Sequence, residues 1–200
     1  QKLFPLDNVT TEDLNRTQLY RNMSMTSSQL DSGDEADIED FLKSLSMQIT
    51  IFDKTTRNKD RAIQLINKTN QFNSNGLRRS EKECERIIND GGKIISASLR
   101  DKNGEHGEVI VILIDKKNVA LSFVMSCRIF KRNVEYIFLN EVLKKLQSSI
   151  MVDYKKTERN KPFEMFLEGF IINPKDGLHK ITIEQISKIA PNAHEIFNVG

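Results

Sequence analysis

Three short apolar segments in succession constrain the fold of this chain more than any other feature. They cover residues 93–100, 108–115 and 119–125, and each has the length and the Ile, Val or Phe content of a β-strand. The stretch DKNGEHG, which joins the first two, is rich in residues that form tight turns. The three segments therefore predict an antiparallel hairpin followed by a third strand, at the centre of a β-sheet.

Helical and strand patterns alternate on both sides of these segments. Apolar residues spaced three or four apart, with Ser80, Pro162 and Thr182 as helix-start signals, predict helices. These helices fall near residues 38–45, 62–73, 81–90, 134–146, 162–169 and 182–189. Further strands are predicted at 47–51, 150–154 and 170–172. The order predicts an α/β (α+β) fold with a mixed central sheet and flanking helices.

Differences in composition along the chain divide it into three parts. Residues 1–36 are polar and Ser-rich, which is typical of an arm or linker, with one short capped helix near 11–20. Residues 37–174 carry the regular patterns and are predicted to form the main domain. Residues 175–200 are predicted to be a C-terminal extension with a short helix on the surface.

Charge and apolar content exclude several classes of protein. The net charge is only +2, so nucleic acid and anionic membranes are not expected as partners. The longest apolar run, Val109–Ile114, is far shorter than a membrane span, and no signal peptide pattern begins the sequence, which predicts a cytoplasmic protein. Two cysteines, Cys84 and Cys127, provide neither a disulfide framework nor a zinc site. No metal is expected.

Three stretches carry a resemblance to a known family. They read RAIQLINKTNQFNSNGLRRS at 61–80, VMSCRIFKRNVE at 124–135 and YKKTERNKPFEMFLEGF at 154–170. Each resembles a signature stretch of the FkbH-like family, and they occur in the same order. In that family a HAD-type phosphatase domain precedes a domain with the GNAT-like acyltransferase fold, and the resemblance covers about 41–170, the GNAT-like part.

The resemblance implies a function in acyl transfer. Members of the family are associated with moving a glyceryl unit from a phosphorylated glycerate to a carrier-protein thiol. The implied partners are an acyl carrier protein and a HAD-type phosphatase domain, in cis or in trans. No Asp-x-Asp-x-Thr or Asp-x-Asp-x-Ser phosphatase motif occurs in the sequence, so residues 1–36 are expected to follow an absent phosphatase domain.

One departure from the GNAT pattern bears on the cofactor. The phosphate-cradling turn of that fold has Gly at its fourth position and Gly or Ala at its sixth, and here Lys131 and Asn133 occupy them. Glycines let backbone N–H groups approach a pyrophosphate closely. Carrier-bound phosphopantetheine, which has no pyrophosphate, therefore fits the turn better than coenzyme A, although either is a candidate.

Candidate catalytic residues are Cys127, Tyr154 and His106. Cys127 precedes a predicted helix start among basic residues, an environment that activates a thiol, and a small apolar core residue is the competing interpretation. His106 is a candidate base in the hairpin turn, and a solvated histidine is the alternative. Tyr154 is a candidate general acid or an edge aromatic. Candidate substrate-binding residues are Asn67, Thr69, Asn70, Asn73, Arg128, Arg132 and Asn160.

Three functions therefore remain open. The first is acyl transfer to a pantetheine thiol with Cys127 as a covalent relay. The second is a noncatalytic module that docks a carrier protein or the phosphatase domain. The third is a free-standing N-acyltransferase that uses acetyl-CoA.

Overall fold

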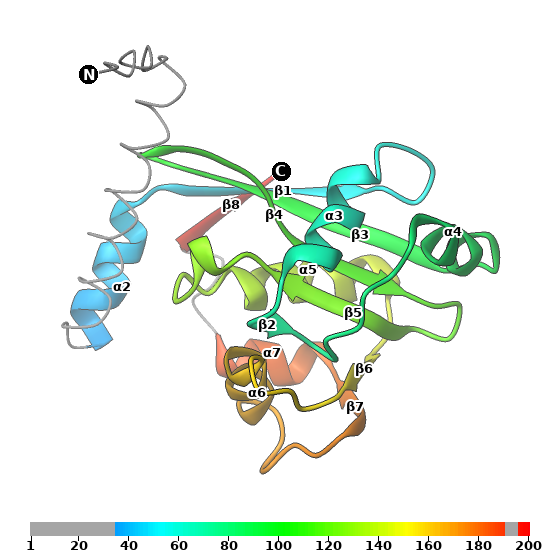
Figure 1. The fold of residues 1–200 in the computed structure, drawn as a ribbon. Coiled ribbons are helices and arrows are strands. Elements are labelled where there is room, and N and C mark those ends of the chain that lie inside the picture. The colour runs from blue at the N-terminus through cyan, green and yellow to red at the C-terminus, as the bar shows by residue number, and fades with distance from the viewer. Residues whose placement is uncertain (1–34, 191–195) are drawn as a thin grey trace, which may run out of the picture.

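The computed structural model describes residues 35–190 and 196–200, and these form an α/β fold around a mixed eight-stranded sheet (Figure 1). The main path of the sheet runs in the order β7-β6-β5-β4-β3-β1-β8, and β2 pairs with β5 beside that path. The strands are β1 (Met47–Asp53), β2 (Phe72–Asn73), β3 (Lys93–Asp101), β4 (Gly104–Ile114), β5 (Val119–Met125), β6 (Ile150–Tyr154), β7 (Gly177–Ile181) and β8 (Phe197–Val199).

Most neighbouring strands are antiparallel, and two pairs are parallel. The central meander β3-β4-β5 is antiparallel, as the three apolar segments predict. Strands β5 and β6 are parallel because the chain between them crosses over through a helix, and β1 and β8 are also parallel. The expected mixed sheet is therefore confirmed.

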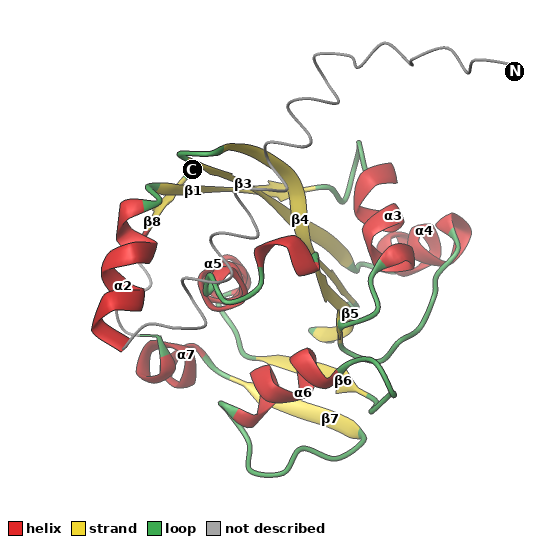
Figure 2. Ribbon diagram, turned by 60° about the vertical axis from the view of Figure 1, so that its left-hand side comes forward, coloured by secondary structure: helices red, strands yellow, loops and turns green. Residues whose placement is uncertain are grey.

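Helices cover both faces of the sheet (Figure 2). They are α2 (Glu35–Ser44), α3 (Asp60–Lys68), α4 (Glu81–Asn89), α5 (Val134–Leu146), α6 (Lys161–Glu168) and α7 (Ile183–Ile189), with a 3₁₀ turn η1 (Cys127–Ile129). The period-two alternation of β4 explains the two layers. Val111 and Leu113 pack in one cluster with α3 and α4, whereas Ile110 and Ile112 pack in the larger cluster with the remaining helices. A strand that is buried on both faces has a continuous run of apolar residues in its sequence.

Several expected element ends are wrong. Helix α3 ends at Lys68, and Thr69 is already extended. The segment 170–172 is not a strand; turn and bend residues occupy it, and β7 begins at Gly177. The hairpin turn is shorter than DKNGEHG, because β4 starts at Gly104. Residue His106 therefore lies in a strand rather than in a turn.

The C-terminal part shares the main sheet and core. Residues 175–200, expected as an extension, supply β7 beside β6 and β8 beside β1. The side chains of Ile181, Ile186 and Phe197 are buried in the larger cluster. The capping boxes expected at Ser80 and Thr182 are both formed, since each side chain accepts a hydrogen bond from the backbone N–H three residues on.

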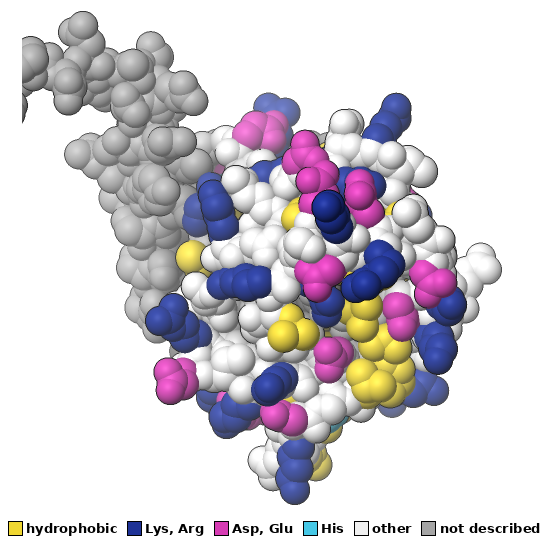
Figure 3. Space-filling model, turned by 45° about the vertical axis from the view of Figure 1, so that its right-hand side comes forward, with side chains coloured by type: hydrophobic (Ala, Val, Ile, Leu, Met, Phe, Trp, Pro, Cys, Tyr) yellow, Lys and Arg dark blue, Asp and Glu magenta, His cyan; other side chains and the backbone are white. Residues whose placement is uncertain are grey.

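The remaining expectations concern the N-terminus, membranes and charge. The expected arm falls almost entirely within residues 1–34, outside the described residues, as does its short helix. None of the helices within 35–190 and 196–200 is long and apolar enough to cross a bilayer. Basic and acidic side chains are interspersed on the face shown in Figure 3, in agreement with the small net charge.

Candidate functional site

The candidate site lies where the parallel strands β5 and β6 separate. These strands pair only at Val119 with Met151 and at Ala120 with Val152. Farther along, β2 takes the place beside β5, with Phe72 opposite Met125. Ser74 then bridges the gap: its N–H donates to the carbonyl of Phe123, and its own carbonyl accepts from Lys155. The end of β5 is left next to an open cleft.

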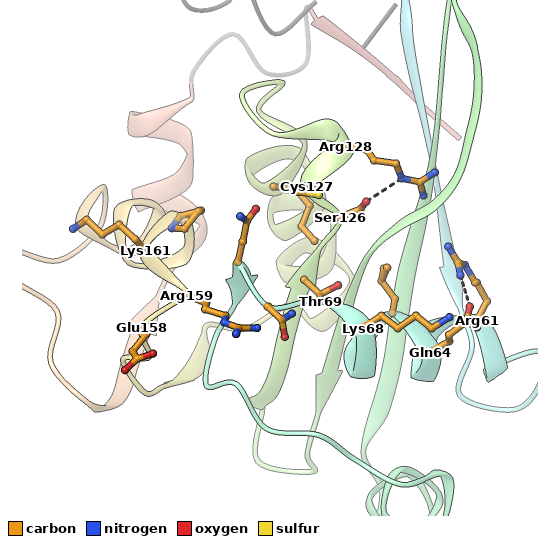
Figure 4. A pocket seen from close by; sticks show the side chains of 15 residues that line it. Arg61, Gln64, Lys68, Thr69, Ser126, Cys127, Arg128, Glu158, Arg159 and Lys161 are labelled. Atoms are coloured by element: carbon orange, nitrogen blue, oxygen red, sulfur yellow. Dashed lines mark hydrogen bonds between the residues drawn. The ribbon is translucent and has the colours of Figure 1, made fainter. Parts of the chain in front are cut away.

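The cleft has a volume of about 720 Å³ and is built from three elements (Figure 4). Helix α3 and the residues after it form one wall, the end of β5 with η1 forms another, and the start of α6 forms the third. The lining residues are Arg61, Gln64, Leu65, Lys68, Thr69, Asn70, Gln71, Met125, Ser126, Cys127, Arg128, Glu158, Arg159, Lys161 and Pro162.

Positive charge dominates the lining. Five side chains are basic and only Glu158 is acidic; the basic ones are Arg61, Lys68, Arg128, Arg159 and Lys161. Lys161 forms ion pairs with Glu164 and Glu168 on its own helix. Such a lining attracts an anion, because like charges brought together in a partly enclosed site raise the local potential.

Cys127 is an exposed thiol on this lining. It begins η1 directly after β5, and Figure 4 shows it beside Ser126 and Arg128. The Arg128 guanidinium is held in place by a hydrogen bond from Nε to the Ser126 hydroxyl, 3.2 Å, and by one to the His106 carbonyl, 3.5 Å. The interpretation of Cys127 as a buried core residue is therefore wrong. The thiol instead lies beside a guanidinium group that hydrogen bonds hold in place.

The turn after Cys127 has an unusual backbone. Lys131 and Asn133 have φ angles of 64° and 62°, in the left-handed region that glycine adopts most easily. Asn133 is the residue before α5. The backbone thus has the conformation that suits small residues at these two positions, while the side chains that occupy them are larger.

His106 and Arg132 meet in the interior rather than in the cleft. The carboxylate Oδ2 of Asp101 lies 2.9 Å from His106 Nε2 and accepts a hydrogen bond of 2.6 Å from Arg132 Nη1. All three residues are buried. Burial by itself raises the pKa of Asp101, but the hydrogen bond to His106 and the Arg132 charge outweigh it and lower the pKa to about 2.

This cluster corrects two expectations. His106 is not solvated and does not line the cleft, and its Nδ1 is buried without a hydrogen-bond partner in the described part of the chain. Arg132 cannot grip a phosphate in the cleft, because its charge is neutralised inside the protein. Both residues instead tie the turn after β5 to the β3–β4 hairpin.

Tyr154 is also absent from the cleft. It is buried at the end of β6, with its ring stacked on Phe163 at a centroid distance of 6.2 Å. Burial, followed by the charges of Glu164 and Asp176, raises the pKa of Tyr154 to about 12. Its hydroxyl therefore keeps its proton in a place that the cleft does not reach.

The asparagines divide into two groups. Asn67, Asn73 and Asn160 hold backbone groups: the Asn160 amide, for example, donates to the carbonyls of Asn73 and Lys155. Thr69 and Asn70 line the cleft. Of the ten residues expected to form the site, the structure thus brings four together there, namely Cys127, Arg128, Thr69 and Asn70.

Sequence reasoning missed several basic side chains of the cleft and the uncharged Gln64. Arg61, Gln64 and Lys68 follow each other at i, i+3 and i+7, so they share one face of α3. Arg159 belongs to the charged loop before α6, and Lys161 is the first residue of that helix. A search for polar residues at helical spacing inside the stretch 61–80 would have found Arg61, Gln64 and Lys68.

The fold and this cleft define an α/β protein with a mixed sheet and an anion-attracting site beside an exposed thiol. Comparison of the chain with protein-family models, with curated proteins and with solved structures gave no match. Within the described residues, no group of three His, Cys, Asp or Glu side chains is arranged to hold a metal ion.

Proposed function

We propose that this chain is the GNAT-like acyl-transfer part of an FkbH-type protein, and that it passes a glyceryl-like acyl group to a pantetheine thiol on an acyl carrier protein. The observation that carries the proposal is the exposed Cys127 thiol on a cleft with five basic side chains. An acyl phosphate or a phosphopantetheine arm is anionic, and such a lining attracts it.

The topology around the cleft supports the proposal. An antiparallel meander feeds a strand, a turn and a helix, and the next strand, β6, then runs parallel to β5 only over its first residues. Strands that part in this way expose backbone groups and make room for an extended ligand between them. The GNAT-like order expected from the sequence agrees with this arrangement.

The turn after Cys127 supports pantetheine over coenzyme A. Lys131 and Asn133 have positive φ angles, which glycine adopts most easily, and their side chains occupy the space that glycine would leave open to a pyrophosphate. A carrier-bound pantetheine arm ends in a single phosphate on the carrier protein. It needs cations at the rim of the cleft, which Lys68 and Arg159 offer as exposed side chains.

Acyl transfer through Cys127 would proceed in two steps. The thiol sulfur attacks the acyl carbon of a glyceryl phosphate anhydride, its proton is released, and inorganic phosphate leaves. The carrier thiol then attacks the resulting thioester, and Cys127 departs as a thiolate that takes up a proton. With 1,3-bisphosphoglycerate as the donor, the acyl group still carries its 3-phosphate, and the phosphatase domain would hydrolyse that ester with water to leave a glyceryl group and inorganic phosphate.

The test is intact-protein mass spectrometry. The full chain is incubated with 1,3-bisphosphoglycerate and an FkbH-type phosphatase domain, and Cys127→Ala and Cys84→Ala are treated in parallel. We expect a glyceryl-sized adduct on the wild type and on Cys84→Ala, because Cys84 is buried, and none on Cys127→Ala. An adduct that persists in Cys127→Ala would refute the relay.

A docking module is the second candidate, and the basic lining favours it equally. A wild-type chain that stays unmodified beside an active phosphatase domain, yet binds the carrier protein, would select this function. The charges of the lining would then complement an acidic carrier surface.

A further inference from the structure

A second cavity adjoins the cleft and has a different character. Its volume is about 330 Å³, and Met125 and Pro162 belong to the linings of both spaces. The other side chains on its lining are mostly aromatic or apolar, and they include Phe72, Phe130, Tyr136, Met165 and Phe166. Neither acyl transfer nor carrier docking, as proposed above, uses this cavity.

Contacts between aromatic rings form the walls of this cavity. The ring centroid of Phe72 lies 6.3 Å from that of Phe130 and 5.3 Å from that of Phe166, and the centroid of Tyr136 lies 5.4 Å from that of Phe166. These rings come from β2, the turn after η1, α5 and α6. Because four segments of the chain supply the rings, the cavity is preformed by the fold, as ligand pockets usually are.

The cavity suits an apolar group. Met125 and Phe166 are almost fully buried, whereas Met165 is 60% exposed and lies at the open side. The two charged residues on the lining, Lys131 and Glu135, have opposite signs, so the cavity does not select an ion by its net charge. An apolar cavity of about 150 Å³ binds benzene, so this larger volume has room for one ring or one short alkyl chain.

The neighbouring cleft has the complementary chemistry. Among its five basic side chains only Arg128 is half-buried rather than exposed, and hydrogen bonds to the Ser126 hydroxyl and the His106 carbonyl orient its guanidinium. Met125 directly precedes Ser126 and lies on both linings. An anionic head and an apolar body on one molecule therefore find complementary surfaces on the two sides of Met125.

We propose that the cleft and this cavity together bind one small amphiphilic anion, with a phosphate head against the basic side chains of the cleft and a short alkyl chain or a single ring in the aromatic cavity. Burial of the chain and attraction of the head to the cations then act on the same molecule. The inference goes beyond the proposed function, which concerns a polar glyceryl group. It does not depend on the Cys127 thiol, because it includes no covalent step.

The test compares hexyl phosphate with methyl phosphate and with 1-hexanol. Methyl NMR of the methionine-labelled full chain reports the two spaces separately, since Met125 lies on both linings and Met165 on that of the cavity alone. At pH 8, where phosphate esters are dianions, hexyl phosphate should shift both signals and leave that of Met47, in the core, unmoved. At low salt it should bind about tenfold or more tightly than either reference compound.

Variants assign the two parts of the ligand. Met165→Asn changes a side chain that is 60% exposed, so it should fold normally and reduce the advantage of hexyl over methyl phosphate about threefold or more. The matched control is Leu178→Asn, which is 54% exposed and outside both spaces and should keep that advantage. Arg128→Gln should reduce the advantage over 1-hexanol, and Cys127→Ala should keep both advantages.

An unshifted Met165 signal, equal affinities for hexyl and methyl phosphate, or an advantage that Met165→Asn retains in full would overturn the proposal. A Met125 signal that shifts without Met165 would remove the apolar part of the site and leave the acyl-transfer function standing. Phosphatidylcholine vesicles that contain phosphatidic acid should not displace hexyl phosphate, because the cavity has room for one short chain. Displacement by these vesicles would contradict a free ligand and indicate a membrane lipid.

Discussion

At the scale of single residues, two arginines of the stretch 124–135 have different environments. Arg128 is partly exposed on the cleft, and Arg132, four positions later, is buried against Asp101. Both follow β5 in a basic turn, and nothing in the local pattern separates them. The difference arises because the turn folds back on the β3–β4 hairpin. In that hairpin the Asp101 carboxylate and the His106 imidazole are buried in the interior.

Replacement of Arg132 by Ala should destabilise the protein strongly. The change leaves the Asp101 carboxylate buried without its charged partner, and the loss of one member of a buried ion pair costs about 3–5 kcal/mol. Urea unfolding followed by circular dichroism measures the difference.

Arg100→Ala is the matched control. Arg100 pairs with Glu105 at 3.4 Å on the surface, and such exposed pairs contribute about 1 kcal/mol or less. A loss below about 1 kcal/mol in Arg132→Ala as well would show that His106 and the backbone N–H of Asn103 satisfy Asp101 by themselves.

The two cysteines show the same dependence on position. Cys84 faces the smaller core cluster from α4, and burial raises the pKa of its thiol, which makes it a poor nucleophile. Cys127 is exposed on the cleft. The apolar residues Ile87 and Ile88 share the packed face of α4 with Cys84, whereas the exposure of Cys127 depends on how β5 ends.

At the scale of elements, the segment after α3 decides the shape of the cleft. It forms the two-residue strand β2 beside β5 and then crosses to β6 through Ser74. Asn75 reinforces this crossing, because its side-chain amide donates to the Leu121 carbonyl and to Asp153. We call such an asparagine a clamp, because its side-chain amide holds a segment whose backbone is not paired in a regular strand.

Asn160 is the clamp that joins this segment to α6. Its amide donates two hydrogen bonds of 2.9 Å, and its Oδ1 accepts from the N–H of Thr157. Asn160→Asp turns the donor into an acceptor that faces two carbonyls, so we expect a loss of about 2–3 kcal/mol in the free energy of unfolding. Chemical denaturation is the measurement.

Asn58→Asp serves as the comparison for that substitution. Asn58 is exposed in a loop with φ of 56°, a conformation that Asp also tolerates, so its change should stay within about 0.5 kcal/mol. Equal effects of the two substitutions would contradict the clamp.

At the scale of the whole molecule, stability should decline from the centre of the sheet to its edges. Strand β4 is hydrogen-bonded to a neighbouring strand on each side, and its side chains are buried continuously from Val109 to Ile114. The edge strand β8 pairs three residues with β1, and β7 pairs with β6 alone. Edge strands open locally without global unfolding.

Hydrogen exchange tests this order. We expect the amides of Ile110–Leu113 to exchange only through global unfolding, and those of β7 and β8 to exchange faster by on the order of 100-fold. Equal protection in β8 and β4 would show instead that the C-terminal strand opens only together with the central meander.

The sequence by itself determined the central meander, the helices with strong periodicity or capping boxes, and the alternation of fold elements. These features depend on local spacing of apolar residues and on turn chemistry, which a single segment carries. It also singled out the stretches 61–80, 124–135 and 154–170, which together supply all three walls of the cleft.

Only the tertiary structure decided which polar side chains face the cleft and which hold the interior. Arg132 and Asn160 bond to residues 31 and 87 positions away along the chain, so their burial depends on contacts that no local pattern encodes. The short strands β2 and β8 follow the same rule. They are too short for a sequence pattern to mark, and each forms by pairing with the backbone of a neighbouring strand.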